Sequence, residues 1–122
     1  MPVNRYLERS VEMTVGTDVA AGRTFSIPEI LASAYDNGRR QGTELSLRTL
    51  FYWGTRGGAL ALGVPEVGHL AVGADADMCL VSMPDWITSE EDALNALLFD
   101  RANTSVETTW VKGKVVYKAA SG

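Results

Sequence analysis

Residues 11–26 read VEMTVGTDVAAGRTFS, a succession of strand, loop and helix-start signals from which the rest of the fold is inferred outward. Val11–Val15 alternates apolar side chains with polar or β-branched ones, which predicts a short strand. A Gly-Thr-Asp sequence ending at Asp18 follows directly, and a glycine-containing loop then leads to Ser26. The carboxyl end of this strand is therefore expected to open onto a turn that carries an aspartate.

The next helix has a recognisable start and end. Ser26 and Glu29 have the spacing of a capping box, and Pro28 falls in the first turn, where its missing N–H does no harm. Gly42 is expected to end the helix. The predicted buried stripe comprises Ile27, Leu31, Ala34 and Tyr35.

Two shorter helices are predicted after this one. Ser46 is expected to cap a helix through LRTLFYW, and Thr55 to open another through GGALAL, which ends at Gly63. Because glycine weakens a helix interior, the pair Gly57 and Gly58 indicates close packing of this last helix.

Past Pro65 the pattern changes from helical to strand-like. Met78–Val81 is an apolar run that predicts a buried strand, and the spacing of Thr88 and Glu91 predicts another helix start. The apolar face of that helix comprises Ala93, Leu94, Leu97 and Leu98. VETTWV and KVVY then flank a Lys-Gly pair, which predicts two strands joined by a turn with Gly113 at positive φ.

Composition limits both the size of the fold and its partners. The 122 residues are 46% hydrophobic and 21% charged, enough for one core but not for a whole eight-stranded barrel. Eleven Lys and Arg against 15 Asp and Glu give a net charge of −4, which argues against binding to nucleic acid or to an anionic membrane. One cysteine cannot form an internal disulfide, and the opening MPVNRYLERS has no signal-peptide core, so a cytoplasmic location is expected.

Asp18 is the strongest candidate for chemistry, and two interpretations of it stay open. A carboxylate placed at the carboxyl end of a strand can bind a metal or move a proton. Aspartate is also a favoured turn residue, so Asp18 could instead hydrogen-bond the amides of its own turn.

The other polar candidates are weaker. His69, between two glycines, predicts an exposed turn rather than a ligand, and Cys79 in an apolar run predicts a small core residue. Asp75 and Asp77 lack the glycine and the distal glutamate of a calcium loop, which leaves turn capping. A zinc site needs several ligands, so a chain with one good catalytic carboxylate is either not an enzyme or not a whole one.

The ordered series of motifs resembles one family. VGTDVAAGRTFS, LSLRTLFYWGTRGGALALG, VGHLAVGADADMCLV and VETTWVKGKVV are similar to the C-terminal part of the amidohydrolase superfamily, and most of all to bacterial guanine deaminases. The resemblance implies an α/β fold that is the C-terminal fragment of a metal-dependent (β/α)8 TIM-barrel hydrolase. Residues 1–63 would supply the last barrel strand and its helices, and 64–122 strands of a small composite β-sandwich with one intervening helix.

The resemblance also implies an activity. It is the zinc-dependent hydrolytic deamination of guanine, a cyclic amidine, to xanthine and ammonia. Asp18 would contact the catalytic zinc and carry the proton, whereas Thr17, Phe25 and Ser26 would only shape the mouth of the pocket. The substrate-binding residues and the other zinc ligands are expected outside this chain, which alone should be inactive. The complete enzyme is expected to be a homodimer that binds a small purine.

Two alternatives remain at this point. One is a non-catalytic binding or scaffold module that keeps the family's tail, and the other is a different deaminase or chlorohydrolase of the superfamily.

If the chain is a fragment, the side chains that would pack on the missing barrel should be exposed to solvent and drive self-association. These residues are Val11–Val15, Ile27, Leu31, Tyr35, Leu50 and Phe51.

Overall fold

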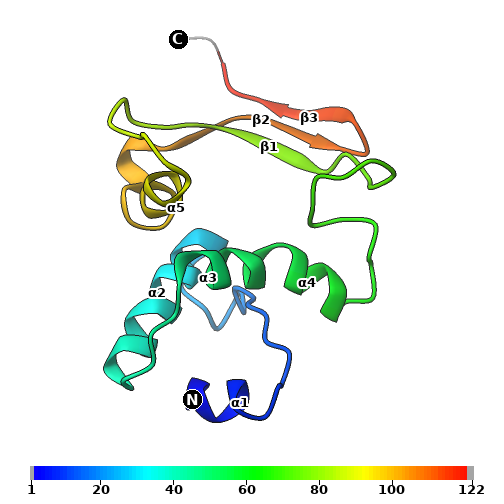
Figure 1. Cartoon of the computed structure of the whole chain (residues 1–122). Coiled ribbons are helices and arrows are strands. Elements are labelled where there is room, and N and C mark those ends of the chain that lie inside the picture. The colour runs from blue at the N-terminus through cyan, green and yellow to red at the C-terminus, as the bar shows by residue number, and fades with distance from the viewer. Residues whose placement is uncertain (1, 121–122) are drawn as a thin grey trace.

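The computed structural model describes residues 2–120, with helices gathered below a small sheet (Figure 1). In chain order the elements are α1 (Val3–Leu7), α2 (Ile27–Arg40), α3 (Leu47–Gly54), α4 (Arg56–Ala61), β1 (Met78–Ser82), α5 (Glu90–Phe99), the 3-10 turn η1 (Arg101–Asn103), β2 (Ser105–Val111) and β3 (Lys114–Lys118). None of the helices within residues 2–120 is long and apolar enough to span a membrane.

The predicted limits of α2 are confirmed. The Ser26 Oγ accepts a hydrogen bond from the Glu29 amide at 3.4 Å, and Pro28 lies in the first turn. The helix ends at Arg40, and Gly42 follows with a φ of 70°, a conformation in which glycine is favoured.

Both predicted starts of the next helices are confirmed, with Ser46 directly before α3 and Thr55 directly before α4, but only Ser46 caps its helix with a side-chain hydrogen bond. The Ser46 Oγ caps α3 by accepting from the Thr49 amide at 3.1 Å. Thr55 does not cap α4, because its hydroxyl donates instead to the Phe51 carbonyl at 2.7 Å. The expected close packing is present, since a Cβ on Gly57 would lie 3.0 Å from the Tyr52 ring.

The sheet is antiparallel in the order β1-β2-β3. Met78 pairs with Trp110 between β1 and β2, and the β2–β3 turn contains Lys112 at φ 49° and Gly113 at φ 74°. The prediction of positive φ at Gly113 is thus confirmed. Both pairings contain an irregularity, between Leu80 and Val81 on β1 and between Thr109 and Trp110 on β2.

The start of α5 lies one residue later than predicted. Ser89, not Thr88, is the cap, and its Oγ accepts from the Asp92 amide at 3.1 Å. Asp92 reaches back to accept from the Thr88 hydroxyl at 2.8 Å and the Thr88 amide at 3.1 Å. These hydrogen bonds, led by the one from the Thr88 hydroxyl, hold the pKa of Asp92 below its usual value.

The core lies where α2, α3 and α5 pack together, with α5 between the sheet and the other two helices (Figure 1). Its buried members are Val3, Leu31, Leu45, Leu50, Trp53 and Leu98. Leu31 and Leu50 are almost completely buried, so the expectation that their faces are bare is wrong. They are covered because the helices close on one another within this chain.

The sheet, in contrast, is largely open to solvent. The prediction that β1 is buried is wrong, because Leu80 is 56% exposed and only Val81 of that strand is half-buried. Every residue of β3 is exposed, including Val116 and Tyr117. The helices bury their apolar residues mainly against each other, and burial in the sheet is confined mostly to β2, where Thr108 is buried and Thr109 and Trp110 are half-buried.

Residues 11–15 do not form the predicted strand. A strand needs hydrogen-bonded neighbours, and within residues 2–120 the sheet contains no strand beside this segment. The segment is held by side chains instead. Met13 and Val15 pack against the core, and the Thr14 hydroxyl donates to the Trp53 carbonyl at 2.8 Å.

Candidate functional site

Asp18 lies at the tip of a tightly closed loop. Its backbone has a φ of 47°, and its carbonyl accepts a hydrogen bond from the Ala21 amide at 3.1 Å and another from the Gly22 amide. Gly22 also forms an isolated bridge with Val19. A Cβ on Gly22 would lie 2.0 Å from the Thr17 carbonyl oxygen, so this closure requires glycine.

The Asp18 carboxylate is free to act on another group. The residue is exposed, and within residues 2–120 its side chain takes part in no hydrogen bond or ion pair. The turn is closed by the backbone carbonyl, so the interpretation in which the carboxylate binds the amides of its own turn is wrong. The catalytic and metal-binding role of Asp18 stays a prediction.

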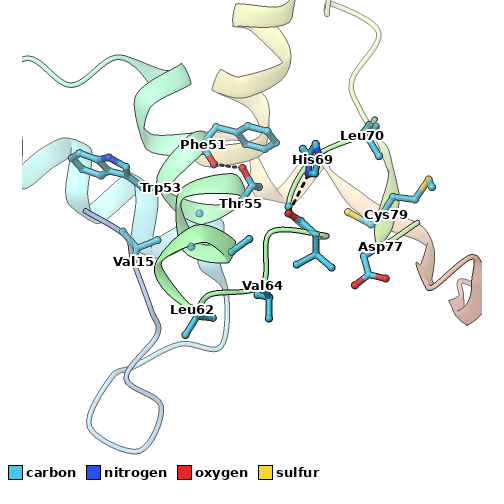
Figure 2. Close-up of a pocket in the computed structure, with 16 residues that line it drawn as sticks. Val15, Phe51, Trp53, Thr55, Leu62, Val64, His69, Leu70, Asp77 and Cys79 are labelled. Carbon is cyan, nitrogen blue, oxygen red and sulfur yellow. Dashed lines mark hydrogen bonds between the residues drawn. The ribbon is translucent and has the colours of Figure 1, made fainter. Parts of the chain in front are cut away.

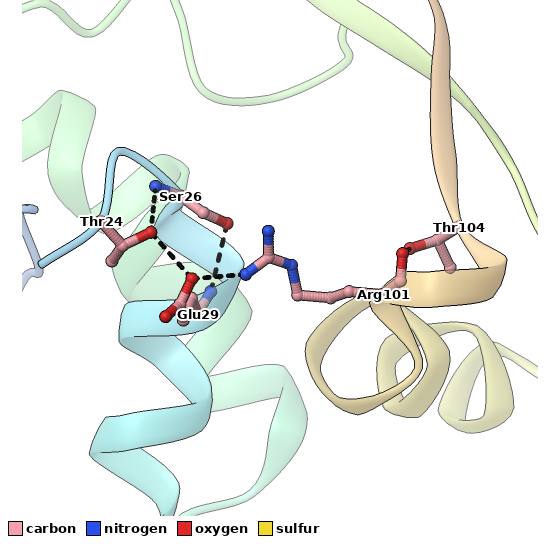
Figure 3. Close-up of polar contacts among 5 residues, drawn as sticks. All are labelled: Thr24, Ser26, Glu29, Arg101 and Thr104. Carbon is pink, nitrogen blue, oxygen red and sulfur yellow. Dashed lines mark hydrogen bonds and ion pairs between the residues drawn. The ribbon is translucent and has the colours of Figure 1, made fainter.

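The other end of the loop is fixed by a polar network that sequence reasoning missed (Figure 3). The Thr24 hydroxyl accepts from the Ser26 amide at 3.0 Å and donates to Glu29 Oε2 at 2.8 Å. Arg101 donates to the same oxygen from 2.6 Å. The Thr24 hydrogen bond first, and then Arg101, hold the pKa of Glu29 below its usual value.

The residues expected around the pocket mouth differ in exposure. Thr17 and Ser26 are half-buried, and Ser26 is occupied as the cap of α2. Phe25 is 86% exposed and projects from the end of the loop. These positions are compatible with a site near the loop but assign no chemistry to the three residues.

The described residues do not form a metal site by themselves. Within residues 2–120 no three His, Cys, Asp or Glu side chains are close enough to hold a metal ion. Asp77 accepts from the Lys112 amide at 2.7 Å, and Asp75 pairs with the Lys112 ammonium at 3.8 Å. These two aspartates therefore stabilise the β2–β3 turn, in line with a structural role.

His69 and Cys79 are not placed as the sequence predicts. His69 is half-buried rather than exposed, and its Nδ1 lies 3.0 Å from the Arg56 Nη1, which also donates to the Val67 carbonyl. Arg56 thus organises the loop that contains His69. Cys79 is exposed on β1 and is therefore not a core residue.

A pocket of about 670 Å³ lies between α3 and α4 on one side and the start of β1 on the other (Figure 2). Its lining is mainly apolar and includes Val15, Phe51, Leu62 and Val64. Asp18 does not line this pocket. The Asp18 carboxylate and the apolar pocket are therefore separate features of the chain.

Comparisons with known proteins give one family. The sequence model of the amidohydrolase family matches residues 1–116. Guanine deaminase from Escherichia coli is 31% identical over an alignment of 121 positions, gaps included, and the match covers 91% of this chain and 28% of that protein. 5'-Deoxyadenosine deaminase from Methanosarcina barkeri is 33% identical over an alignment of 120 positions, gaps included, and that match covers 94% of this chain and 28% of that protein. The solved structure of E. coli guanine deaminase matches with a TM-score of 0.83 and 30% identity, covering 97% of this chain and 30% of that one.

Proposed function

Because the chain belongs to the amidohydrolase family, we propose that it is the C-terminal part of a purine deaminase, with guanine as the favoured substrate. The chain spans about 28% of the length of the curated relatives it matches. Its relatives are deaminases, hydrolases that act on C–N bonds. The free Asp18 carboxylate at the tip of a closed loop is the observation that carries the proposal.

Guanine is favoured over the alternative substrate by two observations. The segment DVAAGRTFS around Asp18 resembles guanine deaminases, and the E. coli enzyme matches this chain both in sequence and in structure. 5'-Deoxyadenosine remains the second candidate because deaminases of that substrate are equally similar, at 33% identity.

The proposed role of Asp18 is proton transfer. The carboxylate takes a proton from the water that attacks the ring carbon and delivers it to the amino group, which leaves as ammonia while the ring gains an oxygen. Amidohydrolases are generally metal-dependent, and zinc would supply activation of the attacking water. Asp18 could serve as one of the metal ligands, since its carboxylate is exposed and makes no hydrogen bond or ion pair within residues 2–120. The remaining ligands would come from outside residues 2–120.

The proposed architecture accounts for two features of the fold. If the segment at 11–15 is the last strand of a (β/α)8 barrel, its missing partners lie in the rest of the protein. If β1, β2 and β3 belong to a β-sandwich, the bare sheet is the face that other strands cover. Residues 1–63 would then form part of the barrel, and residues 64–122 part of the sandwich.

We propose further that the complete enzyme is a homodimer in the cytoplasm.

A segment exchange tests the proposal. E. coli guanine deaminase, with its matching segment replaced by this chain, is assayed for ammonia release from guanine and from 5'-deoxyadenosine. We expect guanine to be preferred, and Asp18→Asn to lower kcat by about 10²- to 10⁴-fold without a change in melting temperature. Asp36→Asn, an exposed aspartate on α2, is the matched control and should keep full activity.

Two results would contradict the proposal. Turnover of Asp18→Asn within a few-fold of the unmodified exchange protein would show that the carboxylate is only a loop residue. Stoichiometric zinc retained by this chain alone after dialysis would favour the self-contained module, because a single carboxylate cannot hold zinc.

A further inference from the structure

The loop that carries Asp18 is attached to the helices at two points. Before the loop, Thr14 is bonded to the Trp53 carbonyl of α3. After it, Thr24 is bonded to Glu29 in the first turn of α2. Between these points the backbone bonds of Asp18 are internal to the loop, to Ala21 and Gly22. The direction in which the loop presents Asp18 is therefore set where it is attached.

The second attachment depends on a residue far along the chain. Glu29 Oε2 accepts from Thr24 on one side and from Arg101 on the other, and Arg101 lies 72 residues from Glu29 (Figure 3). Arg101 belongs to η1, directly after α5, which packs against α2. The guanidinium restricts the rotation of the Glu29 side chain and so keeps the acceptor oxygen turned toward Thr24.

The exposure of the Glu29–Arg101 ion pair indicates that the pair orients side chains rather than stabilises the whole fold. Both side chains are 45% exposed, and exposed ion pairs contribute little to folding. Thr24 is in addition the acceptor for the Ser26 amide, so its hydroxyl joins the loop and the start of α2. A change at Arg101 would therefore reach the loop through Glu29 and Thr24.

We propose that Glu29 and Arg101 are positioning residues, which act through Thr24 to fix the loop that presents Asp18. The inference rests on the proposed function of Asp18, but the structural part of it concerns this chain alone. Neither residue touches the reacting atoms.

The first test measures the loop directly. Hydrogen–deuterium exchange of peptides spanning residues 16–26 is followed by mass spectrometry in the 122-residue chain, a method that tolerates self-association. Glu29→Ala and Arg101→Met should speed exchange of this segment by about two- to fivefold, the ratio expected for loss of an exposed ion pair. Glu29→Gln keeps an acceptor oxygen and should restore most of the protection.

Arg48→Met is the matched control. It removes another exposed ion pair, between Arg48 on α3 and Glu90 on α5 at 2.9 Å, which does not contact the loop. Exchange at residues 16–26 should stay unchanged in this variant. Equal exchange in Arg101→Met and the unmodified chain, or equal acceleration in Arg48→Met, would overturn the inference.

The second test separates the inference from the proposed function. In the exchanged guanine deaminase, Arg101→Met should lower kcat several-fold and leave KM unchanged, whereas Arg48→Met should change neither. Activity that depends on Asp18 but not on Arg101 would overturn the inference and leave the proposed function intact. An exchange protein that is folded but inactive would count against the proposed function, while the exchange rates still decide whether Arg101 holds the loop.

Discussion

Replacing Gly22 by alanine would test the closure of the Asp18 loop. The new Cβ would lie 2.0 Å from the Thr17 carbonyl oxygen and 3.0 Å from the Asp18 carbonyl oxygen. The first distance is about 1 Å shorter than folded proteins tolerate, so the backbone must move. The movement would break the hydrogen bond from the Gly22 amide to Asp18 and the bridge to Val19.

The size of the expected loss of stability in Gly22→Ala follows from the hydrogen bonds that would break. Each backbone hydrogen bond contributes about 0.5–1.5 kcal/mol, and the exposed loop can relax outward without disturbing the core. Gly22→Ala should therefore lower the free energy of unfolding by about 1–3 kcal/mol. Gly16→Ala is the matched control in the same loop, since its Cβ would meet nothing within 4 Å. That change should be neutral or stabilising by up to about 1 kcal/mol, because alanine restricts the unfolded chain.

The assay is urea unfolding of the two variants, followed by circular dichroism at 222 nm. A difference of about 1–4 kcal/mol between them is expected, with Gly16→Ala the more stable. Equal stabilities would refute the reasoning, because they would mean that the loop does not require the close approach at Gly22.

Three further predictions concern the core, the charge network and the sheet. Leu50→Ala, at a completely buried position, should cost about 2–5 kcal/mol in urea unfolding, and a loss below 1 kcal/mol would place Leu50 outside the core. The folded pKa of Glu29 lies below its ordinary value of 4.5, so ionised Glu29 stabilises the fold above about pH 4.5 and this contribution is lost as the pH falls through the folded pKa. Urea unfolding between pH 6 and 3 should show a smaller acid loss for Glu29→Gln, and identical profiles would contradict this. The isolated chain should self-associate through its sheet, so Val116→Thr with Leu80→Thr should shift sedimentation toward monomer and weaken the binding of a hydrophobic dye. Leu7→Thr, on an exposed residue of α1, which lies across the other helices from the sheet (Figure 1), should do neither.

The parts of the fold that the sequence predicts well are those that depend on neighbours in the chain. The Ser26 cap, the Ser46 cap and the turn at Gly113 each need only a few adjacent residues, and all three are present. The predicted start of α5 is one residue too early because the sequence contains two overlapping capping pairs. Ser89 and Asp92 have the same spacing as Thr88 and Glu91, and the structure uses Ser89 and Asp92.

The parts that the sequence does not predict depend on what lies across space. An alternating segment such as Val11–Val15 becomes a strand only beside another strand, and an apolar run such as β1 is buried only where something covers it. The same holds at the candidate site. Asp18 is recognisable from its Gly-Thr-Asp context, but no local pattern could join Glu29 to Arg101, 72 residues away.

The irregular pairing of the sheet affects how the chain would aggregate. Among the described strands β1 and β3 are the outer ones, each of five residues, and the ladders beside them are interrupted at Leu80/Val81 and at Thr109/Trp110. A bulge twists a strand and breaks the regular spacing that an incoming chain would copy. Growth of a fibril by repeated strand addition is thus disfavoured, and assembly should begin without a lag phase, give amorphous oligomers and reverse on dilution.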